Sequence, residues 1–461
     1  MSGIDPRLIA GPDRPRSRAA TRFQLIADPD LPSFTDLPWD VPLEDWTSQR
    51  LVRVVRGIGR HVVRFVAYGG DLFALKELPQ RIALREYATA RHLADASVPA
   101  VEAVGVVSER DPGGQLDAVL ITRYLEFSLP YRSLFSARMD PESRGRLLDA
   151  LATLLVRLHI AGFWWGDCSL SNTLFRRDAG ALEAYLVDAE TAEVHPTLSP
   201  GQRLDDVHRA ARNTLGELFD IAASRPGAVA HIDSAEVADG LRARYTSLFE
   251  ELTGEERFGA DETYRIERRL RRLNELGFDA REVVLRREGG TITLRLDPRV
   301  VEPGHHRRRL HSLTGLDVHE NQARGMLQDI DRYRHHLERT EGVQLAKPMA
   351  ARRWLTEVFT PSVEAIPAEL RGKREPAESF HEILAHRWCL SERAGHDVGT
   401  RQAVRGYVQD VLPPRSDEQT MLGSDNGLDD GAVDLEVLEG GDGAAEVPPG
   451  GGVTGCVDLP G

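Results

Sequence analysis

The chain has 461 residues, of which 41% are hydrophobic, and a formal net charge of −14. This size allows one large core or two to three smaller ones, and the lack of any run of about 18 apolar residues excludes a membrane-spanning helix. The N-terminus has no apolar signal-peptide core and the three cysteines are widely spaced, so we expect a cytoplasmic protein.

The negative charge is concentrated at the carboxy-terminal end. Residues 411–461 contain eleven acidic residues and a single basic one, Arg415. Almost no aromatic residues accompany them, so this segment cannot bury enough apolar surface to offset the entropy lost on ordering. We therefore predict a disordered acidic tail over 411–461.

The first 125 residues contain two kinds of pattern. Residues 1–48 are rich in proline and aspartate, which predicts an extended arm anchored by Trp39 and Trp46. From 49 to 125, strand-like runs alternate with short glycine-bearing connections such as Gly69-Gly70, and a helical stretch follows Pro79. This pattern predicts a small lobe with five antiparallel strands and one helix.

Helical periodicity dominates from 126 to 255. Asp140-Pro141-Glu142 is a strong helix start, and the leucines that follow form a wide apolar face that belongs in a core. Two short strands are expected after the loop WWGDCSLSN, and two more helices near 204–221 and 234–252. Together these elements predict a helical large lobe.

A third, mostly helical unit is predicted over 256–410, with one hairpin in REVVLRREGGTITLRL. Two basic runs, at 265–272 and 305–311, could contact an anionic partner. Acidic residues lie at helical spacing beside the first run, and no aromatic residues are interleaved for base stacking. We interpret the runs as solvated helix faces, and nucleic acid is therefore an unlikely partner.

Four residues form an ordered set that suits phosphoryl transfer. Lys76 lies in the strand-like segment FALKEL. Asp167 and Asn172 lie five residues apart in WWGDCSLSNTLF, and Asp188 follows the apolar run AYLV. Phosphoryl transfer depends on positioning and charge neutralisation, and oxygen ligands suit Mg²⁺, so this set predicts a site for Mg²⁺-bound phosphates. Asp167 would accept the proton of the acceptor hydroxyl, and Asn172 and Asp188 would be metal ligands.

The scarcity of lysine supports the prediction for Lys76. Only three of the 58 basic residues are lysines, and Lys76 is the only one before Lys347. A compact ammonium group differs physically from the planar guanidinium that this chain otherwise uses. The one early lysine lies where a phosphate-binding ammonium is required.

The motif LHIAGFWWGDCSLSNTLF resembles the catalytic loop of the protein-kinase-like superfamily. It is more closely similar to the branch of lipopolysaccharide (Kdo) kinases and aminoglycoside-type phosphotransferases. The whole chain resembles an uncharacterised bacterial family that joins such a domain to a carboxy-terminal domain of unknown function. The resemblance implies an α+β, bilobal kinase-like fold with a small antiparallel-sheet lobe and a helical lobe.

The resemblance also implies roles for individual residues. Lys76 would bind the α- and β-phosphates and pair with Glu86, with Glu77 as the alternative partner. Asp167 would be the catalytic base.

Five further residues would contact the nucleotide by the same resemblance. Gly57 and Gly59 would form the glycine loop over the phosphates. Ala74 would line the base pocket. The backbone of Arg123 and Leu125 would meet the adenine edge.

Three departures from the kinase pattern leave two functions open. Trp165 replaces the histidine of the H-G-D motif, Val62 stands where a third glycine would fall, and Asp188 is followed by Ala189-Glu190. The first hypothesis is a phosphotransferase that moves the γ-phosphate of ATP to a hydroxyl of a small-molecule, lipid-linked or saccharide acceptor. The alternative is an inactive, nucleotide-sensing pseudokinase or binding module whose basic carboxy-terminal domain contacts a polyanion or a protein.

Overall fold

The computed structural model describes most of the chain, and the description below is confined to these residues: 23–27, 31–52, 54, 61–111, 113–131, 134, 141–224, 234–259, 278–288, 291–300, 305–342 and 344–419. The predicted basic run at 265–272 and the glycines Gly57 and Gly59 lie outside them.

A six-stranded antiparallel sheet with one helix, α1 (Gln80–Asp95), forms the small lobe. The strand order is β1-β5-β6-β4-β3-β2. Gly69 and Gly70 have φ values of 63° and 102° and make the tight turn between β3 and β4, as their sequence predicts. The strands are β1 (Gln24–Ala27), β2 (Leu51–Val52), β3 (Val63–Tyr68), β4 (Asp71–Leu78), β5 (Ala103–Ser108) and β6 (Ala118–Arg123).

The amino-terminal arm supplies the sixth strand, which the sequence did not predict. Strand β1 pairs antiparallel with β5 and so covers an edge of the sheet. Trp39 and Trp46 are buried against the sheet, with ring centroids 5.0 Å apart. Arg110 is fully buried and donates from Nε to the Trp39 carbonyl at 2.9 Å, which ties the arm to the lobe.

Three long helices form the core of the large lobe: α3 (Pro141–Ile160), α4 (Pro200–Ser224) and α5 (Ser234–Thr253). Helix α3 starts at Pro141, where the Asp-Pro-Glu motif predicts it. Leu147, Leu151, Leu155 and Leu158 of this helix are buried, as expected from its apolar face. The short strands of the lobe are β7 (Leu129–Pro130), β8 (Phe163–Trp164), β9 (Thr173–Asp178), β10 (Ala181–Leu186) and β11 (Glu193–Val194).

The segment 256–410 divides into two parts that pack differently. A three-stranded sheet packs on the large lobe, because Phe278 and Leu294 are fully buried in the core that includes α3 and α5. Its strands are β12 (Glu256–Gly259), β13 (Phe278–Glu288) and β14 (Thr291–Val300). The rest is helical and has its own core around Trp354 and Phe380.

The helices of this carboxy-terminal helical domain run without a long break. They are α7 (His305–Thr314), α8 (Glu320–Glu341), α9 (Lys347–Trp354), η2 (Leu355–Phe359), α10 (Thr360–Glu364), η3 (Ala368–Lys373), α11 (Pro376–Ala394), α12 (Thr400–Gly406) and η4 (Tyr407–Val411). The prediction of a disordered tail is wrong for residues 411–419, and residues 420–461 lie outside the described residues. Leu412 is fully buried and Glu418 lies in a buried ion pair, so the segment 411–419 is ordered by partners that composition does not reveal.

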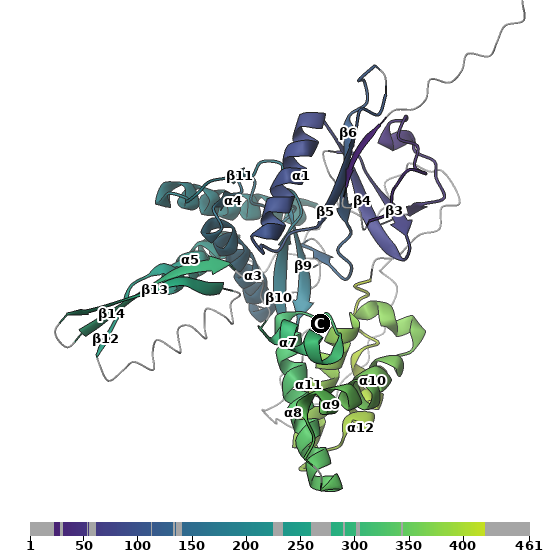
Figure 1. Ribbon diagram of the computed structural model, residues 1–461, viewed down its shortest axis with the longest axis vertical. Coiled ribbons are helices and arrows are strands. Elements are labelled where there is room, and N and C mark those ends of the chain that lie inside the picture. The colour runs from purple at the N-terminus through teal and green to yellow at the C-terminus, as the bar shows by residue number, and fades with distance from the viewer. Residues whose placement is uncertain are drawn as a thin grey trace, which may run out of the picture.

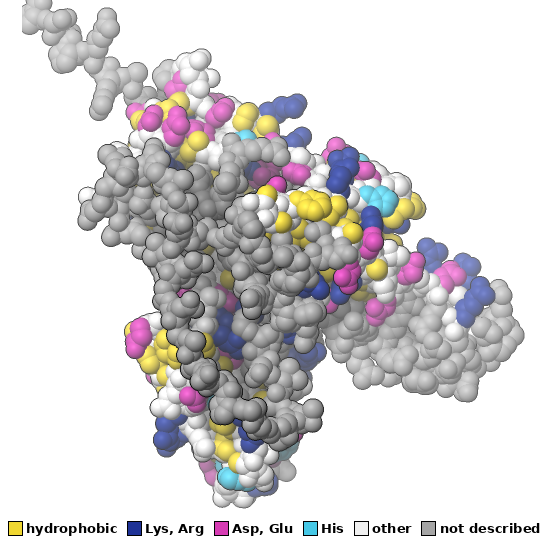
Figure 2. All heavy atoms as spheres, turned by 180° about the vertical axis from the view of Figure 1, so that it is seen from behind, with side chains coloured by type: hydrophobic (Ala, Val, Ile, Leu, Met, Phe, Trp, Pro, Cys, Tyr) yellow, Lys and Arg dark blue, Asp and Glu magenta, His cyan; other side chains and the backbone are white. Residues whose placement is uncertain are grey.

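Figure 1 shows the small lobe above the large lobe, the β12–β14 sheet projecting beside α5, and the helical domain below β9 and β10. Acidic and basic side chains are interspersed on the face seen in Figure 2, in keeping with a nearly balanced charge outside the tail. No described helix is long and apolar enough to span a membrane.

Candidate functional site: a phosphate and metal centre

Strand β4 positions Lys76 by simple alternation. Phe73 and Leu75 are buried in the sheet core, and Ala74 and Lys76 point to the other face. Lys76 Nζ lies 3.2 Å from Glu86 Oε2 and 2.8 Å from Asp188 Oδ2. The ammonium therefore joins β4, helix α1 and the segment after β10 at one point.

Burial and charge change the acidity of this cluster. Burial, with a further contribution from Asp188, raises the pKa of Glu86 from 4.5 to about 7, against the opposing effect of Lys76. Burial alone would lower the pKa of Lys76, but Glu86 and Asp188 outweigh it and the pKa is raised. Lys76 therefore stays positively charged at neutral pH, whereas Glu86 titrates in that range.

The alternative partner, Glu77, lies elsewhere. It is adjacent to Lys76 on the strand and so faces the opposite side of the sheet. Its carboxylate pairs with Arg110 and accepts from the Leu43 amide at 3.2 Å. The structure thus places Glu86 beside Lys76 and uses Glu77 to hold the amino-terminal arm.

Asp167 and Asn172 lie together in the loop between β8 and β9. Asn172 Nδ2 donates to the Asp167 carbonyl at 3.1 Å and to Asp167 Oδ2 at 3.2 Å. The Val187 amide donates to the Asn172 carbonyl at 3.0 Å, one residue before Asp188. These contacts bring the predicted base and both predicted metal ligands into one neighbourhood.

Asp206, which the sequence did not reveal, anchors the same loop. Its fully buried carboxylate accepts from the amides of Trp165 at 2.7 Å and Gly166 at 2.8 Å, and lies 3.1 Å from His159 Nε2. A carboxylate only accepts, so Nε2 carries the imidazole proton and Nδ1 accepts from the Tyr245 hydroxyl at 2.6 Å. The sequence gives one signal for this role of Asp206. The residue lies on α4 four positions before the buried Ala210, and therefore on the apolar face of the helix.

Trp165, the departure from the H-G-D motif, has a positioning role. Its side chain is fully buried, and its indole Nε1 donates to the Asp188 carbonyl at 3.1 Å. The Asp188 carboxylate also accepts from the Glu190 amide at 2.9 Å. Trp165 therefore holds the backbone of a predicted metal ligand, so its presence does not by itself indicate a disabled site.

Cys168, beside Asp167, is a packing residue. Its side chain is fully buried, and burial together with Asp206 raises the pKa of the thiol well above its usual value. The thiolate form is therefore strongly disfavoured.

The predicted adenine-binding backbone begins at Arg123, the last residue of β6, and continues to Leu125. The Arg123 amide donates to the Glu102 carbonyl at 2.8 Å, and the Tyr124 amide donates to the Leu72 carbonyl at 2.9 Å. The Arg123 side chain pairs with Glu102 at 2.6 Å and with Asp71 at 2.8 Å. Its guanidinium therefore links the start of β4 to the residue that directly precedes β5. Ala74 is paired with Thr122 one residue before this segment, which places it next to Arg123 in the sheet.

The donor set fits magnesium and phosphate. Asp188 and Asn172 offer a carboxylate and an amide oxygen, and magnesium binds such oxygen ligands while taking others from phosphate and water. The lysine ammonium already contacts carboxylate oxygens at 2.8 and 3.2 Å, the kind of contact that it would make with phosphate.

Two segments of the chain match known family models. Residues 68–214 match the model of the lipopolysaccharide kinase (Kdo/WaaP) family. This segment is similar to the lipopolysaccharide kinases. Residues 247–412 match a domain of unknown function, DUF4032. The family match and the two-lobed architecture make this part of the chain kinase-like in fold.

A structural search also matched a protein described as "WaaP in complex with acyl carrier protein". The identity is 18%, the match covers 49% of this chain and 100% of that one, and the TM-score is 0.32. A score this low adds no argument about function. A search of curated proteins gave no match.

Proposed function

We propose that the chain is an ATP-dependent phosphotransferase of the kinase-like superfamily that acts on a hydroxyl of a small-molecule, lipid-linked or saccharide acceptor in the cytoplasm. The observation that carries the proposal is the convergence of Lys76 on both Glu86 and Asp188, with Asp167 and Asn172 joined to the same segment. Each of the four groups expected from the sequence has a physical role there.

Lys76 would neutralise the α- and β-phosphates, held in place by Glu86. Asn172 and Asp188 would hold Mg²⁺, which supplies charge neutralisation on the phosphate oxygens when it is bound. Asp167 would orient the acceptor hydroxyl and take its proton. The Arg123 carbonyl and the Leu125 amide would contact the edge of the adenine ring, and Ala74 would line the pocket that holds this ring.

The short segment after Asp188 supports a small acceptor. Only residues 189–199 separate it from α4, and two of them form β11, which pairs with β8. A segment of this length, fixed to the large lobe by a strand pair, leaves no long loop to be ordered by phosphorylation. This favours a small-molecule, lipid or saccharide acceptor over a peptide selected by a gated loop.

The test combines nucleotide binding with turnover. A ligand at about a hundred times its dissociation constant adds about 2.7 kcal/mol to stability, so ATP with Mg²⁺ should raise the melting temperature clearly. The proposal predicts this shift together with slow ATP hydrolysis that is lost in Asp167→Asn. Asp149→Asn, which alters an exposed ion pair with Arg244, is the matched control.

The two functions give different results in this test. A thermal shift with no hydrolysis or self-phosphorylation, under conditions where Asp167→Asn matches the parent, would favour a nucleotide-sensing module. No shift with ATP and Mg²⁺ would refute both functions.

A further inference from the structure

The β9–β10 hairpin links the metal-binding residues to the carboxy-terminal helical domain. Asn172 directly precedes β9, and Asp188 lies two residues after β10. Six residue pairs, from Thr173↔Leu186 to Asp178↔Ala181, join the two strands. At about 3.4 Å per residue, the hairpin spans about 20 Å from the metal ligands to its turn.

The turn has a conformation that needs support. Ala179 has a φ of 53° and Gly180 a φ of 81°, so a residue with a side chain occupies the left-handed region. Glu378 of α11 accepts from the Ala179 amide at 2.9 Å and from the Gly180 amide at 3.4 Å. Gln322 in turn donates to Glu378 at 2.9 Å. The helical domain therefore binds the backbone of this turn with a buried carboxylate.

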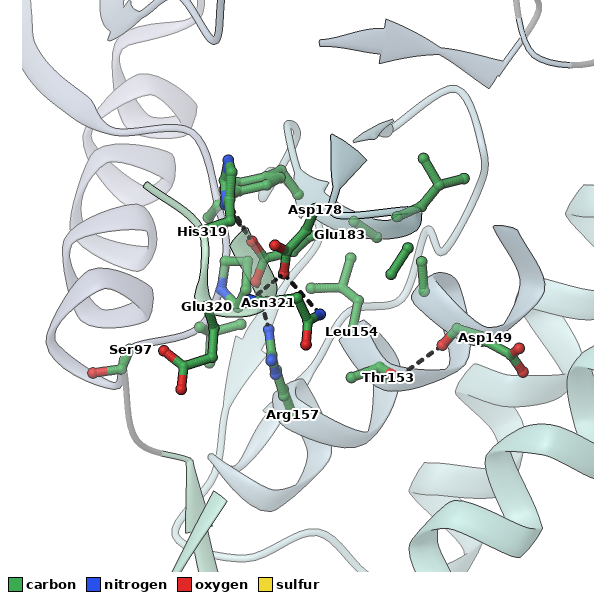
Figure 3. Close-up of a pocket in the computed structure, with 18 of the residues that line it drawn as sticks. Ser97, Asp149, Thr153, Leu154, Arg157, Asp178, Glu183, His319, Glu320 and Asn321 are labelled. Atoms are coloured by element: carbon green, nitrogen blue, oxygen red, sulfur yellow. Dashed lines mark hydrogen bonds and ion pairs between the residues drawn. The ribbon is translucent and has the colours of Figure 1, made fainter. Parts of the chain in front are cut away.

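Asp178, the last residue of β9, caps helix α8. It is 6% exposed and accepts from the amides of Asn321 at 3.2 Å and Gln322 at 3.0 Å, and from Asn321 Nδ2 at 3.0 Å. A carboxylate at a helix N-terminus satisfies amides that have no partner within the helix and interacts favourably with the helix dipole. Figure 3 shows Asp178 and Asn321 directed toward one another.

Charged side chains along the hairpin complete the contact. Arg177 Nε lies 2.7 Å from Glu418, which is also 2.9 Å from Arg374 Nη1. Arg176 pairs with Glu375 at 2.9 Å. The ordering of residues 411–419 is thus coupled to the same hairpin.

On β10, Glu183 continues the contact toward α3 and α8. Its carboxylate lies 3.0 Å from Arg157 and 3.2 Å from His319, and accepts from the Tyr185 hydroxyl at 2.8 Å. These groups line one side of a cavity of about 730 Å³ between α3, β10 and the start of α8 (Figure 3). The hairpin is therefore held by the helical domain on both strands and at the turn.

We infer that the carboxy-terminal helical domain positions Asn172 and Asp188, the metal ligands of the phosphotransfer site, through the β9–β10 hairpin. Asp178 and Glu378 are the positioning residues. Loss of one partner from a buried charged contact leaves the other uncompensated, so the hairpin cannot leave the domain without a large cost. This inference rests on the proposed function, because it concerns how Mg²⁺ is bound.

Glu378→Gln tests the inference with a nearly isosteric change that removes the charge from the turn. Glu378 acts on the metal ligands over the length of the hairpin, and substitutions that change coupling over such distances typically alter it by about 2- to 30-fold, so we expect the Mg²⁺ concentration that half-saturates ATP binding to rise by about threefold. Nucleotide affinity in excess Mg²⁺ should change little. Hydrogen exchange over 173–187 should increase.

Glu357→Gln is the matched control, since this exposed carboxylate belongs to the same domain and contacts Arg353 and Tyr333 but not the hairpin. It should leave the Mg²⁺ requirement unchanged. A purely structural role for Glu378 would lower the melting temperature of Glu378→Gln and leave its Mg²⁺ requirement equal to that of the parent, and this result would overturn the inference.

A charge exchange gives a second test that does not depend on the folding of Glu378→Gln. Arg176→Glu and Glu375→Arg should each raise the Mg²⁺ requirement, and the double variant should restore it, because both side chains are less than one quarter exposed. Three equal Mg²⁺ requirements would contradict the inference. If the parent itself fails to bind ATP with Mg²⁺, both the proposed function and the inference are wrong. If the parent binds ATP with Mg²⁺ but the variants have the same Mg²⁺ requirement as the parent, only the inference is wrong.

Discussion

Replacing Glu86 by glutamine tests the electrostatics of the phosphate site. In the folded protein, the pKa of Glu86 is raised from 4.5 to about 7. An acid of this kind contributes stability that is fully present below pH 4.5 and is lost as the pH rises through about 7. Each pKa unit corresponds to about 1.36 kcal/mol, so the full loss is about 3 kcal/mol.

Glutamine does not titrate, and the variant escapes this loss. The free energy of unfolding of Glu86→Gln, relative to that of the parent, should therefore increase by about 2.5 kcal/mol between about pH 5 and about pH 8. The side chain of Glu86 is only 4% exposed, so solvent screening should not remove the effect.

Urea denaturation at several pH values provides the measurement, with Asp149→Asn as the exposed control that should follow the parent. A stability difference that stays constant across this range would refute the reasoning. ATP affinity should change in the opposite direction to stability. Because Lys76 loses one of its two carboxylate partners, the variant should bind ATP more weakly at pH 8 even as its stability rises.

Other substitutions separate the roles of the remaining residues. Asp167→Asn should lower turnover by about 10² to 10⁴ while keeping ATP affinity, measured by radiometric turnover and by titration; an equal loss of affinity would assign Asp167 to metal binding or structure. Asp206→Asn places an amide among buried donors and should reduce the free energy of unfolding by about 3 kcal/mol in urea titrations, whereas a change below about 0.5 kcal/mol would show that the loop does not depend on it. Trp165→Phe removes the donor to the Asp188 carbonyl and should raise the Mg²⁺ requirement by about fivefold, in line with a hydrogen bond worth about 1 kcal/mol; an unchanged requirement would leave the indole with a packing role only.

Local patterns predicted much of the kinase-like fold. Alternation in FALKEL predicted the strand that carries Lys76, and the Asp-Pro-Glu start and leucine face predicted α3. The order of Asp167, Asn172 and Asp188 predicted residues that the structure brings together. These features depend on neighbours in the chain or on a motif with fixed spacing, and both can be read directly from a sequence.

The features that the sequence did not reveal depend on distant partners. Strand β1 needs the edge of β5, and the segment 411–419 needs Arg177 and Arg374. In the sequence, Asp206 looks like an ordinary polar position on a helix, and only its contact with the loop between β8 and β9 shows its role. The segment 256–410 divides into two parts because Phe278 and Leu294 are buried in the core of the large lobe, whereas the sequence predicts a separate unit over 256–410. In each case the deciding contact joins residues far apart in the chain.

A crystal structure of the protein with ATP and Mn²⁺ tests the central claim most directly, because manganese scatters anomalously and accepts the same oxygen ligands as magnesium. The account predicts an anomalous peak within about 2.2 Å of oxygens from both Asn172 and Asp188, with Lys76 on the α- and β-phosphates. ATP bound away from Lys76, or a metal with neither Asn172 nor Asp188 among its ligands, would contradict it.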